Sequence, residues 1–396
     1  MAELRASVMT AAGKETVVLA YSGGLDTTCI LAWLRDSGHD VVAFCADLGQ
    51  GDDMDEVRAN AEKIGAKHVV IRDLRREFVQ EFVWPAVAAG AIYEDRYLLG
   101  TALARPLIAR ELLATAREHG ATSVSHGATG KGNDQIRFEL ACLALQPGIK
   151  EHNFHVPATP KAPWSIDSNL MHTSYESGVL EDPAHAPPPE LFQRTRHAHA
   201  APDTPLEMEV DFSQGVPVRV SCQGRAITDP LEMVEFLNQA AGEHGVGRVD
   251  VVENRVVGMK SRGVYETPGV TILYHAHLDL ECMVLDREVR RLKQYLATRF
   301  SEQVYGGLWF SPECEFTRKC LTESQRLVTG SVRLRLSKGN VEILGRSSPS
   351  SPYNQDLVSM DVQGDYTPED AEGFIRITAV RLAEHMRVKA AAGVDG

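Results

Sequence analysis

Hydrophobic and polar positions alternate in blocks over the first 150 residues, and the blocks have the lengths of strands and helices. Strands are expected over residues 17–21, 41–46, 69–71 and 123–125, and residues 41–46 form a near-continuous apolar run of the kind that is buried on both faces. Apolar residues at helical spacing predict helices over residues 27–34, 54–64, 77–89 with a break near Pro85, 103–119 and 134–145. Repeated strand–helix units predict an α/β fold with a doubly wound parallel sheet, whose ligand site lies at the carboxyl ends of the strands.

The pattern changes after residue 150, where a proline-rich crossing segment leads into a mixed half. The elements expected there are strands over 207–220, 248–257 and 271–274, helices over 230–244 and 286–303, and a hairpin over 333–343. A last amphipathic helix follows Thr367, a good N-cap, with Pro368 at its first position. We therefore expect an α/β domain over residues 1–155, an α+β domain over 156–364 and a C-terminal helical arm over 365–396.

A glycine-rich turn follows the first expected strand and opens the first helix. Its residues are Ala20, Tyr21, Ser22, Gly23, Gly24, Leu25, Asp26, Thr27 and Thr28. Two glycines allow close approach of the backbone to an anion, and a helix N-terminus directs free N–H groups toward it. The spacing is not that of a Walker A loop, because no lysine follows the glycines. It resembles the pyrophosphate loop of enzymes that split ATP into AMP and pyrophosphate; the alternative is a turn that only packs.

A second polar turn follows the strand expected at 123–125. It contains Gly127, Thr129, Lys131, Asn133, Asp134 and Arg137. The glycines and the lysine suit an anion, and the amide, carboxylate and guanidinium at the start of the next helix suit a zwitterionic ligand. A plain surface loop would not need this density of polar groups.

Composition narrows the possible partners. The chain has 396 residues and a net charge of −13, so its surface as a whole repels nucleic acid, and an anionic substrate has to meet local positive features. No apolar run has the length of a membrane span, so we expect no membrane partner. Seven scattered cysteines without a Cys-x-x-Cys pair favour reduced thiols and a cytoplasmic location. His275 and His277 have no further ligands nearby in the sequence, so we expect structural histidines and no protein metal cage.

Taken together, the two turns and several longer stretches resemble the argininosuccinate synthase family. The other stretches that carry the resemblance are 93–101, 103–106, 245–248, 252–255, 258–268 and 359–366. The resemblance implies that citrulline, aspartate and ATP give argininosuccinate, AMP and pyrophosphate through a citrullyl-adenylate. It also implies ATP with Mg²⁺, no prosthetic group, a nucleotide-binding domain followed by a synthetase domain, and a homotetramer.

The resemblance also implies a role for individual residues. For ATP it implies residues 20–28 of the first turn together with Ala46, Gly127 and Thr129. For aspartate it implies Thr129, Asn133 and Asp134. For citrulline it implies Tyr97, Thr101, Asn133, Arg137, Ser165, Ser174, Glu253 and Tyr265. Its candidates for catalysis are Ser22, Asp26, Asp134 and Arg137. Taken singly, Tyr97 could be a core aromatic, Ser165 a turn cap and Glu253 part of a structural ion pair.

The chain departs from the family pattern after Lys150. Roughly 25 residues that would supply the next parallel strand and its helix are missing, and only a short stretch to Pro157 lies between the matching segments. Either residues 153–156 form a substitute strand, or the domain is smaller and exposes a sheet edge. The gap leaves an alternative open, a silent paralogue that binds ATP or citrulline in a regulatory or assembly role. A tRNA thiolase or an amidotransferase is disfavoured, because paired cysteines, a basic patch and a glutaminase domain are missing.

Overall fold

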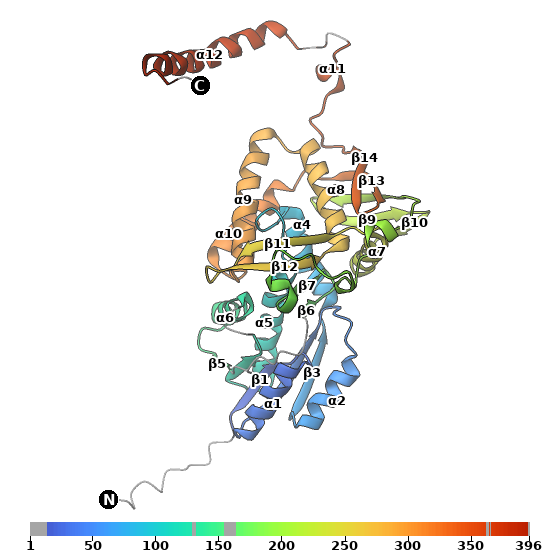
Figure 1. Ribbon diagram of the computed structural model, residues 1–396, viewed down its shortest axis with the longest axis vertical. Helices are drawn as coiled ribbons and strands as arrows, with labels where there is room; N and C mark the ends of the chain where they lie inside the picture. Colours follow the sequence, from blue (N-terminus) through green and yellow to red (C-terminus); the bar gives the residue numbers. More distant parts are fainter. Residues whose placement is uncertain (1–13, 129–131, 154–163, 362–363, 365, 395–396) are drawn as a thin grey trace, which may run out of the picture. The chain divides into compact units, whose positions relative to one another are not determined.

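The computed structural model describes residues 14–128, 132–153, 164–361, 364 and 366–394, and its elements are labelled in Figure 1. The chain divides into two compact units, residues 1–351 and residues 352–396, and each is described on its own. Among the described residues, no helix is both long and apolar enough to cross a lipid bilayer.

The first unit begins with a five-stranded sheet in which every neighbouring pair is parallel. Its strands are β1 (Thr16–Ala20), β2 (Asp40–Asp47), β3 (His68–Asp73), β4 (Ser123–His126) and β5 (Lys150–Asn153). They are arranged in the order β3-β2-β1-β4-β5. The order reverses direction between β1 and β4, so the turns after these two strands leave the sheet on opposite sides and a crevice opens between them. The predicted doubly wound α/β class is confirmed.

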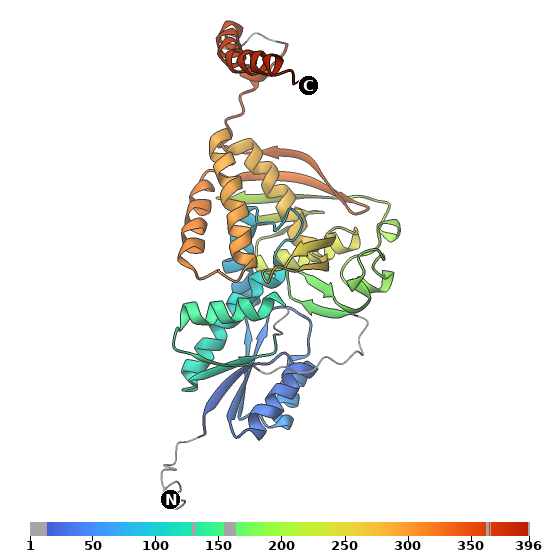
Figure 2. The same ribbon diagram turned by 60° about the vertical axis from the view of Figure 1, so that its left-hand side comes forward.

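Helices cover both faces of this sheet, as the two colour groups flanking it in Figure 2 show. They are α1 (Leu25–Asp36), α2 (Met54–Ile64), α5 (Gly100–Glu118) and α6 (Asn133–Leu145). Successive residues of β1 serve different cores: Val17 and Leu19 pack with Leu34 of α1, whereas Val18 packs with Leu107 of α5, and all five side chains are fully buried. The alternation places the strand between two apolar layers and explains its unbroken hydrophobic run.

The helix expected at 77–89 is present, but it changes its winding. Residues 75–89 run through α3 (Arg75–Glu77), a π-helical segment η1 (Phe78–Val83) and α4 (Trp84–Ala89). The wide turn lies directly before Pro85, which has no N–H for the helix ladder and would clash with a carbonyl one turn earlier. The irregularity predicted near Pro85 is therefore a local π bulge, after which the helix continues.

The described residues in the second half of the first unit form two antiparallel sheets and four long helices. One sheet has the order β10-β9-β8-β13-β14, and the other has the order β11-β12-β7-β6. The strands are β6 (Ser165–Ser168), β7 (Thr173–Glu176), β8 (Leu206–Ser213), β9 (Val216–Cys222), β10 (Arg225–Ile227), β11 (Arg248–Asn254), β12 (Lys260–Glu266), β13 (Gly330–Ser337) and β14 (Asn340–Ser347). The helices are α7 (Pro230–Glu243), α8 (Pro268–Val284), α9 (Arg287–Tyr305) and α10 (Pro312–Ser324).

The strand predicted at 271–274 is wrong, because these residues lie in α8. The apolar run was short enough for either structure, and Pro268 at the first turn was the signal for a helix. Of the two histidines beside it, His277 is buried, and its Nε2 lies 2.8 Å from Oε1 of Gln325. Burial lowers the pKa of His277 to about 4, so its ring is neutral at pH 7.

The irregular segment between β7 and β8 is held by one buried carboxylate. Glu266, at the end of β12, accepts hydrogen bonds from the hydroxyl of Tyr175 at 2.5 Å and from the backbone N–H groups of Gln193, Arg194 and Thr195 at 2.8–3.2 Å. A fully buried carboxylate is stable only with such partners. It fixes the crossing segment against the sheet that lines the site described below.

The gap after Lys150 is bridged by a short strand. β5 starts at Lys150, three residues earlier than the substitute strand considered from sequence, and pairs with all four residues of β4, from Ser123 to His126. Among the described residues, the sheet therefore has five strands. Residues 154–163, which follow, lie outside the described part.

The second unit contains a short helix α11 (Gln355–Val358) and the long helix α12 (Pro368–Ala391). The helix predicted after Thr367 is confirmed, and none of its described residues is buried. Several large apolar side chains of α12 are exposed, among them Phe374, Ile375, Ile377 and Leu382.

Candidate active site

A cavity of about 930 Å³ lies at the carboxyl ends of β1, β2 and β4 and is closed by side chains from β6, β7, β11 and β12. It is therefore located where the reversal of strand order predicts a ligand site. The residues that the sequence singled out and that line it are Ala20, Tyr21, Ser22, Gly23, Gly24, Asp26, Thr27, Ala46, Tyr97, Thr101, Gly127, Asn133, Asp134, Arg137, Ser174, Glu253 and Tyr265.

Four expected residues are not among those that line the cavity. Leu25 is 63% exposed at the start of α1, Ser165 is exposed on β6, and Thr28 contacts Tyr21 through the two hydroxyls at 3.2 Å. Thr129 lies outside the described residues.

The first turn is pre-formed by its own hydroxyl groups. The hydroxyl of Thr27 donates to the carbonyl of Gly24 at 3.2 Å and accepts from the N–H of Ser22 at 3.3 Å. Gly23 has a φ of +79°, and a side chain there would press on Val57. Gly24 is the N-cap of α1 and offers no side-chain cap, which leaves N–H groups of the first helical turn directed at the cavity. The geometry is that of an anion cradle.

The second turn approaches the first one. A Cβ on Gly127 would lie 3.1 Å from Cγ2 of Thr27, so the absence of a side chain allows the two turns to meet. Next to them, Ala46 at the end of β2 is bonded through its carbonyl to the side-chain amide of Gln50 at 3.0 Å. Cys45 also lines the cavity, and burial raises the pKa of its thiol to about 12, so it is no nucleophile at pH 7.

Asp134 lies between two guanidinium groups. Its Oδ2 accepts from Nε and NH2 of Arg105 at 3.0 and 2.8 Å, and its Oδ1 accepts from NH1 of Arg137 at 2.9 Å. Burial alone would raise the pKa of this carboxyl, but the charges of Arg105 and Arg137 outweigh burial and lower the pKa to about 2. Asp134 is therefore ionised at any pH at which the fold operates.

The same network continues across the cavity to β6. Arg105 donates a second bond from NH2, to Oδ2 of Asp167 at 2.6 Å, and the hydroxyl of Thr101 donates to the same oxygen at 3.0 Å. The Thr101 hydroxyl also lies 2.8 Å from Nε2 of His172, whose pKa burial lowers to about 3. Only glycine fits at position 100, because a Cβ there would lie 2.3 Å from the His172 ring.

A cluster of tyrosines surrounds Glu253. Its Oε1 accepts from the hydroxyls of Tyr265 at 3.0 Å and Tyr305 at 2.9 Å, while the buried Oε2 has no hydrogen-bond partner among the described residues. Burial raises the pKa of Glu253, as expected for a carboxyl that lacks a full set of donors. The ring of Tyr97 stacks on Tyr265 with centroids 4.4 Å apart, so Tyr97 is both a core aromatic and a wall of the cavity.

Asn133 has a supporting position between the two halves. Its amide donates to the hydroxyl of Tyr305 at 2.9 Å and accepts from the N–H of Val256 at 3.1 Å. Arg137 similarly donates from Nε to the carbonyl of Tyr305 at 2.9 Å. These contacts use only part of the donors of each side chain, so both can still bind a ligand.

Two central residues were missed as site residues from sequence, Arg105 and Asp167. Arg105 stood inside a stretch that carried the family resemblance, so a signal existed. It lies about one and a half turns from Gly100 on the same helix, and its guanidinium reaches both acidic partners. Asp167 belongs to a four-residue strand that no periodicity indicated. Asp167 could therefore not be assigned to the site before the two halves were seen together.

A parallel sheet with a glycine-rich loop at its switch point, facing carboxylates and guanidiniums, defines an α/β nucleotide-binding enzyme that handles a zwitterionic second substrate. Two family models match this chain: the arginosuccinate synthase N-terminal HUP domain over residues 16–154 and the arginosuccinate synthase C-terminal domain over residues 164–385. The chain belongs to the argininosuccinate synthase family.

Full-length relatives agree with this assignment. Argininosuccinate synthase of Danio rerio is 56% identical over 406 residues, with 96% of this chain and 98% of the relative covered. The enzymes of Gallus gallus and Homo sapiens are 54% and 53% identical over 403 residues, with 95% of this chain and 97% and 98% of the relatives covered. The aligned lengths exceed the 396 residues of this chain, so these relatives carry residues that it lacks.

The Asp134 network predicts a pH dependence of stability. The pKa of the Asp134 carboxyl is lower in the folded chain than its ordinary value near 4. Its ionisation therefore adds about 2 kcal/mol to the free energy of unfolding above pH ~4, and this stabilisation is lost as the pH falls toward 2. We expect Asp134→Asn to be less stable than the parent at pH 7, and the difference in unfolding free energy to shrink by about half at pH 3.

Urea denaturation of both proteins at several pH values measures this difference. Asp36→Asn, in which the changed carboxyl is exposed and pairs with Arg35, is the control and should show a small difference that does not depend on the buried network. A difference for Asp134→Asn that stays constant between pH 7 and pH 3 would contradict the assignment.

Proposed function

We propose that this chain joins citrulline to aspartate at the expense of ATP, and that argininosuccinate, AMP and pyrophosphate are the products. Membership of the family along nearly the whole chain supports this activity. The observation that carries it is the single cavity in which the anion-binding turn faces the Arg105–Asp134–Arg137 network and Glu253.

The ATP phosphates would lie on the first turn, at the N-terminus of α1. Ser22, Gly23, Gly24 and Thr27 would bind them through N–H and hydroxyl groups, and Ala46 and Gly127 would contact the nucleoside end. The carboxylates of Asp26 and Asp52 line the same cavity and would hold the Mg²⁺ bound to ATP, an ion that takes oxygen ligands and neutralises phosphate charge. Tyr21 and Thr28 would support the turn through their hydroxyl contact, and Leu25 would contribute only backbone.

Citrulline would lie between the two halves. The free Oε2 of Glu253 is suited to accept from its ammonium or ureido N–H groups, while Arg137 would pair with its carboxylate. Tyr97, Thr101, Asn133, Ser174 and Tyr265 line the remaining space and would complete the site. Ser165, which is exposed on β6, would have to be brought in on binding.

Aspartate would bind beside Thr129, Asn133 and Asp134. A carboxyl with a pKa of about 2 is a weak base, so Asp134 would orient the amine of aspartate through its negative charge and would not remove its proton. Asp134, which the family resemblance implies for catalysis, would therefore act by orienting the amine.

The chemistry needs no nucleophile from the protein. The ureido oxygen of citrulline would attack the α-phosphorus of ATP. A bond between this oxygen and the α-phosphorus would form, the bond from the α-phosphorus to pyrophosphate would break, and citrullyl-adenylate would result. The amine of aspartate would then attack the ureido carbon, and AMP would leave with the oxygen. Catalysis would consist of positioning and charge stabilisation. Ser22, with its hydroxyl at the turn, and Arg137 would stabilise the charge that develops in the first step.

We expect pyrophosphate release that requires both citrulline and ATP. We expect argininosuccinate and AMP to form only when aspartate is also present. A coupled pyrophosphate assay with all three substrates, and with each one omitted, measures it, and mass spectrometry identifies argininosuccinate. Binding of ATP and citrulline without turnover would favour the silent paralogue and would reject the proposed activity.

We expect Glu253→Gln to raise the KM for citrulline by about 30- to 100-fold, because a buried charge-assisted hydrogen bond contributes about 2–3 kcal/mol. The KM for ATP should change little, since the turn that holds ATP is at the other end of the cavity. Glu207→Gln, at an exposed carboxylate paired with Arg335, is the matched control and should behave as the parent. Equal loss of affinity for ATP and citrulline would argue against the assignment.

We also propose a homotetramer in the cytoplasm, with α12 as the element that packs on another subunit. Its exposed apolar side chains, including Phe374 and Ile377, would be buried by a second copy. Removal of residues 367–396 should lower the mass measured by light scattering after size exclusion. An unchanged mass would reject a role of this helix in assembly.

A further inference from the structure

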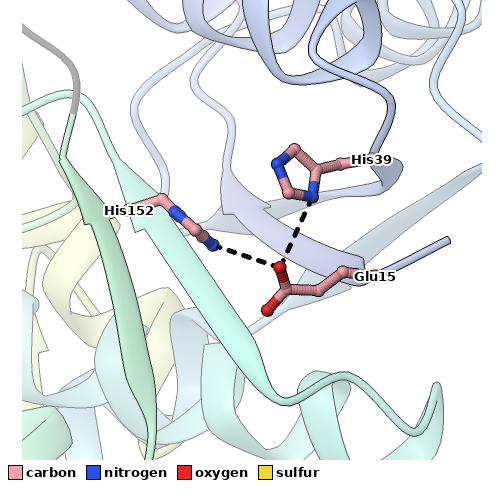
Figure 3. A group of neighbouring side chains, drawn as sticks. All are labelled: Glu15, His39 and His152. Carbon is pink, nitrogen blue, oxygen red and sulfur yellow. Dashed lines mark ion pairs between the residues drawn. The ribbon is translucent and has the colours of Figure 1, made fainter. Parts of the chain in front are cut away.

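Two histidines and a glutamate come together at the amino end of the first sheet, away from the cavity. Glu15 directly precedes β1, His39 directly precedes β2, and His152 lies in β5. Figure 3 shows the carboxylate of Glu15 between the two imidazole rings. The distance from the cluster to the turn at Ser22 is about one strand length, roughly 16 Å at 3.3 Å per residue, so it is separate from the proposed active site.

The cluster has the donor set of a transition-metal site. Oε2 of Glu15 lies 3.7 Å from Nδ1 of His39 and 3.8 Å from Nε2 of His152, and the three candidate ligand atoms lie within 4.8 Å of one another. These distances are too long for direct hydrogen bonds. Ligands of a tetrahedral zinc ion are about 3.4 Å apart when its bonds are about 2.0–2.2 Å, so small side-chain rotations would close the site around an ion.

A second observation points to a missing ligand. Nε2 of His152 is shielded from solvent and has no hydrogen-bond partner among the described residues. A buried ring nitrogen without a partner is costly unless something binds it, and at neutral pH it presents a lone pair or a proton. This nitrogen points toward the Glu15 carboxylate, which lies 3.8 Å away.

The glutamate is oriented for such a role. The hydroxyl of Ser123 donates to the other oxygen of Glu15 at 2.5 Å, an outer-shell contact of the kind that fixes metal-binding carboxylates. Lys150 is the nearby charge that opposes a cation. The side chains of Glu15, His39 and His152 are 31%, 19% and 29% exposed, so an ion can enter and keep a water ligand.

We propose that Glu15, His39 and His152 form a binding site for one divalent transition-metal ion of the zinc class, with water at the open position. Imidazole and carboxylate ligands suit this class of ion. The ion would tie β5, the short edge strand that follows the gap, to the start of β1 and the segment before β2. It would therefore stabilise the outer edge of the sheet, next to the residues that the sequence predicts to be missing.

Zinc binding to the full, untagged chain tests the proposal. After treatment with a chelator and its removal, titration calorimetry with Zn²⁺ alone should show one site, and the midpoint of thermal unfolding should rise with Zn²⁺. His152→Ala and Glu15→Gln should weaken binding at least tenfold and abolish the thermal shift. Visible absorption of the Co²⁺-loaded protein should report nitrogen and oxygen ligands in the parent and should be absent in both variants.

His68→Ala is the matched control. The rings of His68 and His119 are neighbours, with centroids 5.1 Å apart, and neither residue belongs to a cluster that could hold an ion. The loss of the His68 ring should therefore leave zinc binding unchanged. Circular dichroism shows whether each variant folds. If His152→Ala does not fold, His39→Gln replaces it as the test of a histidine ligand. Binding that survives in Glu15→Gln and His39→Gln, or that is lost in Glu151→Gln of the separate His126–Glu139–Glu151 cluster, would overturn the proposal.

Discussion

The contact on which the site depends is the carboxylate of Asp134 held between Arg105 and Arg137. Two arginines this deeply buried are stable only because carboxylates compensate them, and removal of one partner would leave an unpaired charge. The network joins α5 and α6 of the nucleotide-binding half to Asp167 of β6 and, through the carbonyl of Tyr305, to α9. One set of ion pairs therefore sets the spacing of elements that are far apart in the chain.

This balance also explains how an acidic chain can bind anions. With a net charge of −13, the surface as a whole offers no attraction to ATP. Arg105 and Arg137 are largely neutralised by Asp134 and Asp167, so they cannot supply much free charge. Arg255, which also lines the cavity, is paired with Glu176. Among the described residues, the N-termini of α1 and α6 are further positive features, and both begin beside the cavity. Backbone N–H groups and helix dipoles, which need no basic surface, are thus the main anion-binding elements.

Local signals in the sequence predicted most of the fold. The strands and helices around the first turn were found because their apolar periodicity and capping residues are local properties, as with α2, whose ends match the expectation of 54–64. The strand prediction at 271–274 was wrong because a short apolar run fits either a strand or a helix. Arg105 and Asp167 were missed because their roles arise only when β6 packs over α5. The Glu15–His39–His152 cluster was missed for the same reason, because only the strand order of the sheet brings its members together.

The shortened region leaves the site in place for a reason that the sheet makes clear. β4 carries the turn at Gly127, and all four of its residues are buried. Because β5 pairs along the whole length of β4, that strand keeps a neighbour on each side, with β1 on the other. The residues that the sequence predicts to be missing after Lys150 would therefore fall at the outer edge, where a four-residue strand ends the sheet. A strand inside the sheet holds its turn by two ladders of hydrogen bonds, so the meeting of Gly127 with Thr27 does not depend on the residues that are missing.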